Sequence, residues 1–159
     1  HIEHQFSTGD AYYTRVSPYN SYDCFTDYDI RIWSVEVESN NTISAANRLN
    51  ENNSIHLSNL DTLVSGYISS SSDDDYFRVY GESGKDICVD LIVPSGVDYD
   101  VTLENLNGSI QEASTNGGDS NESFCFNVPG VAYGPYIIHI YPYSGYSNSD
   151  VYECYVVIK

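Results

Sequence analysis

The chain of 159 residues is long enough for one domain with a hydrophobic core, and its 23 acidic and six basic residues give a net charge of −17 at pH 7. Such a charge repels nucleic-acid phosphates and anionic lipid head groups, so no nucleic acid is expected as a partner. No apolar run approaches the roughly 20 residues of a membrane-spanning helix, so no membrane insertion is expected. The hydrophobic content of 41% indicates a folded chain, and the excess of carboxylates suits a protein that collects a hard cation such as Ca²⁺.

The N-terminal part of the chain resembles its C-terminal end. A shift of 124 positions places Ala11–Ile32 on Pro135–Val156 without gaps, with 5 of 22 positions identical. Residues 1–34 are therefore predicted to be the C-terminal hairpin of a preceding copy of the same domain, and residues 35–159 the complete domain. Chance similarity between tyrosine-rich segments is the alternative. The unpaired edges of a lone hairpin would allow a homo-oligomer to form by strand exchange.

Strand signals dominate the rest of the chain, because short runs with period-two alternation recur between clusters of Gly, Ser, Asn and Asp. The best helical candidate is the short segment 42–50. This pattern favours an all-β fold, an antiparallel β-sandwich or jelly roll of about eight strands. The clearest strand candidates are residues 62–69, 75–80, 86–93, 99–106, 122–128, 136–143 and 152–159.

Two acidic segments are candidates for a cation site. In "EVESNN", Glu36, Glu38 and Asn40 point to one side if the segment is extended, because side chains alternate along a strand. In "SSSSDDDYF", Asp73 and Asp75 share a side and Asp74 points away. A solvated acidic loop is the competing interpretation for both segments.

A third acidic pair, Asp98 and Asp100, suits a turn that enters a strand better than a metal site, because Asp side chains satisfy nearby backbone donors.

One strand presents a candidate binding row. If Tyr136 and its alternating apolar neighbours face the core, then Ile137, His139 and Tyr141 share the outer face, with Tyr143 near its edge. Aromatic rings with polar tips on a rigid sheet can stack on sugars or hold a peptide. Ordinary cross-strand packing is the alternative for each ring.

The four cysteines have no C-x-x-C spacing. Cys88 and Cys125 share the non-core phase of their strands, so a cross-strand disulfide between them is expected as one of the open pairings. Cys154 lies at a core phase and is expected to be a buried thiol.

No catalytic signature is present: the sequence has no H-E-x-x-H, no G-x-S-x-G and no Cys–His arrangement, so an enzyme is not expected.

Four motifs in order resemble the bacterial pre-peptidase C-terminal domain family, which includes the collagen-binding domains of clostridial collagenases. They are "VEVESNNTISAANRL", "VSGYISSSSDDDYFRV", "GVDYDVTLENLNGSIQEAS" and "GPYIIHIYPYSGYSNSDVYECYVVI", which together span about residues 36–158. The usual Pro-Asn-Asp of the first motif is replaced here by Ser39, Asn40 and Asn41, so one expected carboxylate is an amide.

The resemblance implies a calcium site that joins the two acidic segments. Its ligands would be Glu36, Glu38, Asn40, Asn41, Asp73 and Asp75, together with a serine of the run 69–72. It also implies that the outer sheet face with His139, Tyr141 and Tyr143 holds a ligand, without identifying collagen as that ligand.

These observations predict a non-catalytic accessory module of a secreted or cell-surface bacterial protein, in which calcium stabilises the fold. The expected partner is a protein or polysaccharide polymer, either collagen-like or of the cell wall. The alternatives are a spacer or folding aid without a ligand, and a carbohydrate-binding module.

Overall fold

The computed structural model describes residues 32–49, 51–52, 55–56, 61–130 and 134–159. Most of the predicted N-terminal hairpin, residues 1–34, therefore lies outside the described residues, and that part of the domain division stays a prediction. The predicted boundary between residues 34 and 35 falls within a described strand, β1 (Ile32–Val35).

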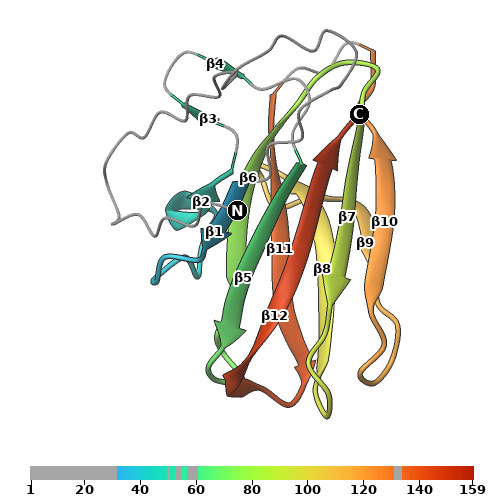
Figure 1. The fold of residues 1–159 in the computed structure, drawn as a ribbon. Helices are drawn as coiled ribbons and strands as arrows, with labels where there is room; N and C mark the ends of the chain where they lie inside the picture. Colours follow the sequence, from blue (N-terminus) through green and yellow to red (C-terminus); the bar gives the residue numbers. More distant parts are fainter. Residues whose placement is uncertain (1–31, 50, 53–54, 57–60, 131–133) are drawn as a thin grey trace, which may run out of the picture. The chain divides into compact units, whose positions relative to one another are not determined.

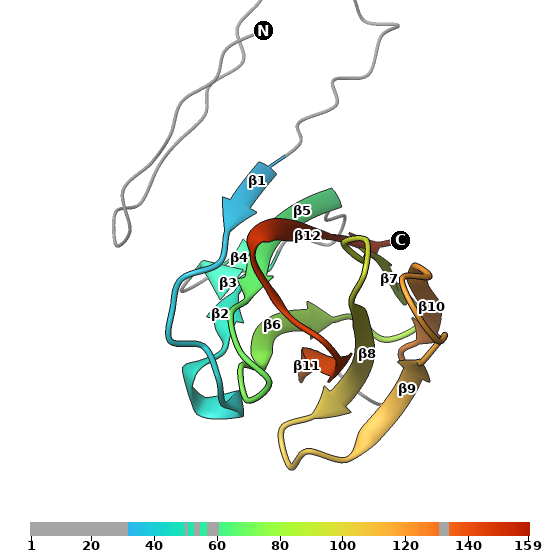
Figure 2. The ribbon, with the colours of Figure 1, turned by 90° about the horizontal axis from the view of Figure 1, so that it is seen from below.

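Two five-stranded sheets face each other across one hydrophobic core (Figures 1 and 2). In order across the first sheet lie β1, β5 (Asp61–Ile68), β12 (Ser147–Ile158), β7 (Asp86–Ile92) and β10 (Glu122–Asn127). In order across the second lie β2 (Asn47–Arg48), β6 (Asp75–Gly81), β11 (Gly134–Ser144), β8 (Asp98–Asn105) and β9 (Ile110–Ser114). A short separate pair consists of β3 (Glu51–Asn52) and β4 (Ile55–His56).

The eight strands from β5 to β12 have jelly-roll connectivity. Counted from β5, the first sheet contains the first, eighth, third and sixth strands, and the second contains the second, seventh, fourth and fifth. Successive strands alternate between the two sheets except for β8 and β9, which pair within the second sheet, and this is the order that two Greek keys produce. The predicted fold class and approximate strand number are therefore confirmed.

Period-two alternation builds the core, as the sequence predicts. Along β6 every second side chain is buried, and the same alternation recurs in β5 and at the end of β12. Burial of one such aliphatic or aromatic side chain stabilises the fold by about 1.5–3 kcal/mol. Tyr136, Ile138 and Ile140 belong to the core, as does the thiol of Cys154, which is 1% exposed.

The predicted helix is reduced to a single 3-10 turn, η1 (Ile43–Ala45), which Thr42 caps by accepting a hydrogen bond from the amide of Ala45. The chain then enters β2, which pairs in parallel with β6. The propensity of the segment for helix is thus overridden by pairing to the sheet edge.

The predicted disulfide is present. Cys88 on β7 and Cys125 on β10 lie directly opposite each other, with 4.0 Å between their Cα atoms. The bridge joins the edge strand β10 to the interior of its sheet.

Candidate metal centre

Three carboxylates converge where β1 leads into the sandwich. Glu36 and Glu38 follow β1 directly, and Asp75 is the first residue of β6. One oxygen atom of each lies within 4.8 Å of the others. The backbone amide of Glu36 donates to the carbonyl oxygen of Ser65 at 3.0 Å, so the pairing of β1 with β5 continues as far as the first carboxylate.

The carboxylate of Glu36 is held by β5 and β12. Its Oε1 accepts a hydrogen bond from the amide of Tyr67 at 2.6 Å, and its Oε2 accepts one from the hydroxyl of Tyr152 at 2.9 Å. Gly66 makes this position possible, because a Cβ atom there would overlap the carboxylate. A glycine inside a strand thus marks a close approach of another group to the backbone.

Asp75 is buried without full hydrogen bonding. Its side chain is 0% exposed, Oδ2 accepts a hydrogen bond from Tyr152 at 2.7 Å, and Oδ1 has no partner. Burial, followed by the interaction with Glu36, raises the pKa of Asp75 to about 9. Burial also raises the pKa of Glu38, and the charges of Asp73 and Glu36 add to that effect.

The loop that carries Glu38 also holds a buried amide, that of Asn40. Asn40 is 0% exposed, and neither its side-chain oxygen nor its side-chain nitrogen has a hydrogen-bond partner. Its backbone is fixed, because its carbonyl oxygen accepts a hydrogen bond from the amide of Tyr76 at 3.2 Å. An unpaired buried amide oxygen costs free energy unless a donor or a cation meets it.

The remaining two predicted ligands are engaged in hydrogen bonds. Oδ2 of Asp73 accepts from both the amide and the hydroxyl of Ser69, each at 2.6 Å. With the Asn41 amide oriented to satisfy both of its polar atoms, its nitrogen donates to Oδ1 of Asp73 at 3.0 Å and to the carbonyl oxygen of Asp74 at 2.7 Å. These bonds connect the two acidic segments that the sequence singled out.

The segment that carries Glu38 and Asn40 is a closed loop. The Asn47 side chain accepts a hydrogen bond from the amide of Val37 at 2.7 Å and donates one to its carbonyl oxygen at 3.1 Å. Both ends of the loop 37–47 are thereby joined. Within it, the peptide bond between Glu38 and Ser39 is cis.

The donor set consists of carboxylate and amide oxygens, which suit a hard cation rather than a thiolate- or imidazole-binding metal. Oδ1 of Asp75 is buried without a hydrogen-bond partner and belongs to the cluster, so it is an atom that a cation bound there would satisfy. The cluster of Glu36, Glu38 and Asp75 could therefore hold a metal ion.

The predicted binding row is only partly exposed. On the outer face of the second sheet the His139 ring stacks on Tyr76, with 4.1 Å between centroids and 12° between planes, and lies 4.9 Å from the Tyr141 ring. His139 Nδ1 is 2.9 Å from Glu104 Oε1, and Nε2 is 3.6 Å from Asp74 Oδ2.

The two ends of this row differ in exposure. Ile137 is completely buried although it points away from the core, because Arg78 and Glu104 flank it on the neighbouring strands. Tyr143 is 73% exposed and lies at a β-bulge between Pro142 and Ser144.

The third acidic pair lies on β8 rather than in a turn. Asp98 and Asp100 are 8% and 5% exposed. Burial raises the pKa of Asp100, whereas a hydrogen bond from Tyr141 opposes the rise. Burial, followed by the charge of Asp100, raises the pKa of Tyr141 to about 12.

Two further residues of the site were not singled out as ligands or supports by the sequence pattern, Tyr152 and Gly66. Tyr152 is one of the five identities of the internal repeat, paired with Tyr28. Gly66 lies at a buried position of β5, where the alternation favours an apolar side chain, and a glycine there is the signal that could have revealed it.

Comparison with known proteins gives a likeness of fold. No protein-family model matches the chain, and neither does any curated protein. Among solved structures, the pre-peptidase C-terminal domain of a collagenase from Bacillus anthracis superposes with a TM-score of 0.50 and 17% sequence identity, covering 72% of this chain and 94% of that one. The chain has the pre-peptidase C-terminal fold.

PliG, a periplasmic inhibitor of g-type lysozyme from Aeromonas hydrophila, is less similar, with a TM-score of 0.41, 12% identity, and coverage of 82% of this chain and 100% of that one. Within the pre-peptidase C-terminal fold of this chain, the acidic cluster lies at the end of β1, which pairs with β5, and at the start of β6.

Among the described residues, no helix has the length and apolar character needed to cross a membrane.

Proposed function

We propose that the chain is a non-catalytic accessory module whose fold is stabilised by Ca²⁺ bound at Glu36, Glu38 and Asp75. The observation that carries this proposal is the buried Oδ1 of Asp75, which has no hydrogen-bond partner and lies beside two further carboxylates. A divalent cation would offset the repulsion of these carboxylates and satisfy that oxygen.

Calcium fits the donor set better than other common metals. It accepts six to eight oxygen ligands from carboxylates, amide and backbone carbonyls, and water, in a flexible geometry. The side-chain oxygen of Asn40 would add a fourth protein ligand to the three carboxylates. Asp73 and Asn41 connect the ligand segments by hydrogen bonds and would supply further negative charge and orientation.

Thermal unfolding tests the calcium proposal. At 100 times its dissociation constant, calcium should add about 2.7 kcal/mol to the free energy of unfolding, which raises the midpoint by roughly 5–15 °C. The Asp75→Asn variant should lose the calcium-dependent shift, whereas Glu112→Gln, which changes an exposed carboxylate on β9, should retain it. An unchanged wild-type midpoint at millimolar calcium, relative to chelator, contradicts the site.

A second function, polymer binding, is supported by the outer face of the second sheet. The rings of Tyr76, His139 and Tyr141 form a contiguous aromatic surface, and Tyr143 projects beside it with 73% of its surface exposed. Co-sedimentation with insoluble collagen, chitin, cellulose and peptidoglycan tests this function. Tyr143→Ala should weaken the binding of the chain to whichever polymer retains it. If none of the four polymers retains the wild-type chain, the alternative of a spacer or folding aid is favoured.

Export to the cell surface or the extracellular space is part of the proposal. The Cys88–Cys125 bridge supports it, because structural disulfides persist in oxidising compartments.

Strand exchange through residues 1–34 is proposed as a route to a homo-oligomer, and light scattering of the whole chain tests it. A monomeric mass over a wide concentration range would exclude that route.

A further inference from the structure

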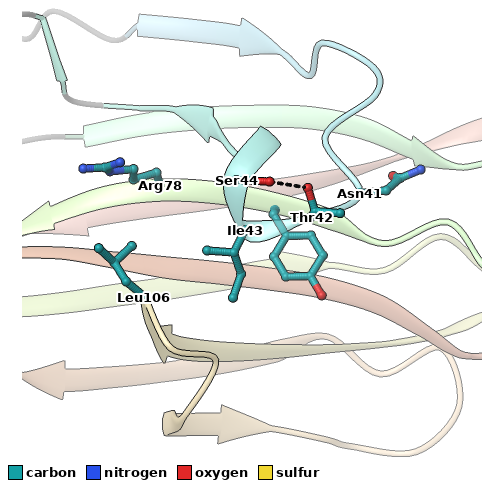
Figure 3. Close-up of a pocket in the computed structure, with 7 residues that line it drawn as sticks. Asn41, Thr42, Ile43, Ser44, Arg78 and Leu106 are labelled. Atoms are coloured by element: carbon teal, nitrogen blue, oxygen red, sulfur yellow. Dashed lines mark hydrogen bonds between the residues drawn. The ribbon is translucent and has the colours of Figure 1, made fainter.

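A pocket of about 580 Å³ opens on the outer face of the second sheet, beside the metal centre. Its lining comes from the loop 37–47, from β6 and from the turn after β8 (Figure 3). The lining residues are Asn41, Thr42, Ile43, Ser44, Tyr76, Arg78 and Leu106.

The two apolar walls of the pocket are held in place. Leu106 lies in the turn after β8, where the side-chain oxygen of Asn105 accepts hydrogen bonds from the amides of Asn107 and Ser109. Ile43 lies over the same turn, since a Cβ atom at Gly108 would be only 3.6 Å from its Cδ1. Leu106 remains 46% exposed, so part of its side chain is available to a ligand in the pocket.

The polar groups of the pocket are hydrogen-bonding groups rather than acids. Thr42 and Ser44 present hydroxyls whose oxygens lie 3.2 Å apart, and Arg78 adds a guanidinium. The Asn41 side chain is part of the wall, and its amide nitrogen is engaged with Asp73 and Asp74. None of the seven lining residues is a carboxylate, although the chain has a net charge of −17. The surrounding charge disfavours an anionic ligand, and the lining offers no carboxylate to a cationic one.

An uncharged ligand with both apolar faces and many hydroxyls matches this lining. A pyranose ring packs its C–H faces on an aromatic or aliphatic side chain, while its hydroxyls exchange hydrogen bonds with hydroxyl, amide and guanidinium groups. The volume of the pocket is within the range of small-molecule sites. Tyr76 supplies the aromatic ring, and its stack on His139 holds one face of that ring in place.

We infer that this pocket is a binding site for a neutral hexopyranose unit of a glycan, and that its wall at Asn41–Ser44 is fixed by the metal centre. The loop 37–47 carries both features, because Glu38 belongs to the cluster and residues 41–44 line the pocket. The Asn41 amide bonds to Asp73 and Asp74, which ties the wall to the acidic segment before β6. The calcium dependence of sugar binding rests on the proposed function; the sugar site itself does not.

Amide chemical shifts of the whole ¹⁵N-labelled chain test the inference, with calcium present and with cellotetraose, maltotetraose and N-acetylchitotetraose as probes. At least one sugar should produce saturable shifts at Ile43, Ser44, Tyr76 and Leu106. Leu106→Ala should weaken that binding roughly five- to tenfold, as truncation of a well-packed contact does. The matched control is Ile92→Ala, which shortens an aliphatic side chain that is 42% exposed on the other sheet and should bind as the wild type does.

The absence of saturable shifts with all three sugars would overturn the inference. So would an unchanged affinity of Leu106→Ala, or shifts of the same amides by a lysine-rich peptide in place of the sugars. Repeating the titration in chelator should weaken sugar binding.

The outcomes distinguish failure of the calcium proposal from failure of the sugar site. If calcium leaves the unfolding midpoint unchanged but a sugar still shifts the pocket amides, the sugar site stands without its calcium dependence. If calcium stabilises the chain and no sugar binds, the calcium module stands and the sugar site is overturned.

Discussion

The hydroxyl of Tyr152 lies 2.7 Å from Oδ2 of Asp75, so the last strand of the sandwich donates its phenol to the first residue of β6. The same hydroxyl is 2.9 Å from Glu36. A tyrosine has one hydroxyl proton, and two carboxylates compete for it here. The ring is anchored in the core, where it packs edge to face against Tyr99. Tyr152 therefore connects the acidic cluster directly to the core.

Tyr152→Phe should destabilise the chain more in chelator than in calcium. Without the hydroxyl, the buried carboxyl group of Asp75 loses its hydrogen-bond partner, which costs about 1–3 kcal/mol unless a cation replaces it. Chemical denaturation in chelator and in calcium measures both values. Tyr155→Phe on the same strand is the control, since its hydroxyl bonds to Glu153 away from the cluster. An equal loss of stability in both solutions would show that the hydroxyl does not act through the cluster.

Stability in chelator should fall as pH rises from about 4 to about 9. The pKa of Asp75 is raised to about 9 in the fold from its ordinary value of 3.8, so between these values the folded chain holds a proton that the unfolded chain has lost. Stability decreases with pH wherever the folded state binds more protons. Calcium displaces that proton, so its affinity should increase over the same range. Calorimetric titrations in buffers of different ionisation enthalpy should detect the released proton, and an affinity independent of pH would contradict this assignment.

Gly66→Ala should abolish or strongly weaken calcium binding. The added Cβ atom would occupy the position of the Glu36 carboxylate and crowd the hydroxyl of Tyr152, so Glu36 would have to leave the cluster. Gly117→Ala is the matched control, because no atom lies within 4 Å of a Cβ at that position. The measurement is the calcium-dependent shift of the unfolding midpoint. A shift in Gly66→Ala as large as in the wild type would indicate that Glu36 is not a ligand.

Loss of the disulfide should lower the free energy of unfolding without changing calcium affinity. The Cys88–Cys125 bridge closes a loop across a sequence separation of 37 residues and lies on β7 and β10, whereas the cluster lies near β1, β5 and β6. Removing a disulfide of this kind costs about 2–4 kcal/mol. Urea denaturation of Cys88→Ser/Cys125→Ser measures that cost, and added reductant should destabilise the wild type but not the double variant.

The strands and the core follow from local patterns, and for that reason the sequence predicts them well. The alternation along "DYFRVY" and "YIIHIY" selects the side chains that the core buries, and the phases of Cys88 and Cys125 place the two thiols on the same face. At the entry to β6 the same alternation separates buried Asp73 and Asp75 from Asp74, whose side chain is 38% exposed. Such features depend only on residues that are near one another in the chain.

The details of the site depend on long-range pairing, which alternation does not encode. Tyr152 and Glu36 are 116 positions apart, and they meet because β5 lies between β1 and β12. The burial of Ile137 on the outer face likewise requires Arg78 and Glu104 from two other strands. The resemblance to the pre-peptidase C-terminal family supplies the juxtaposition of the two acidic segments, which composition and periodicity alone leave as solvated loops.

The parallel pairing of β1 with β5 determines how the module responds to mechanical tension. Ile32 and Val156 both lie opposite Thr62, so the polypeptide enters and leaves the first sheet at the same end. A pull on the two flanking segments therefore loads the hydrogen bonds of β1 one after another, in an unzipping geometry. Glu36 is the first residue beyond that strand, so a bound cation would be the next element to carry the force before the sandwich itself begins to open.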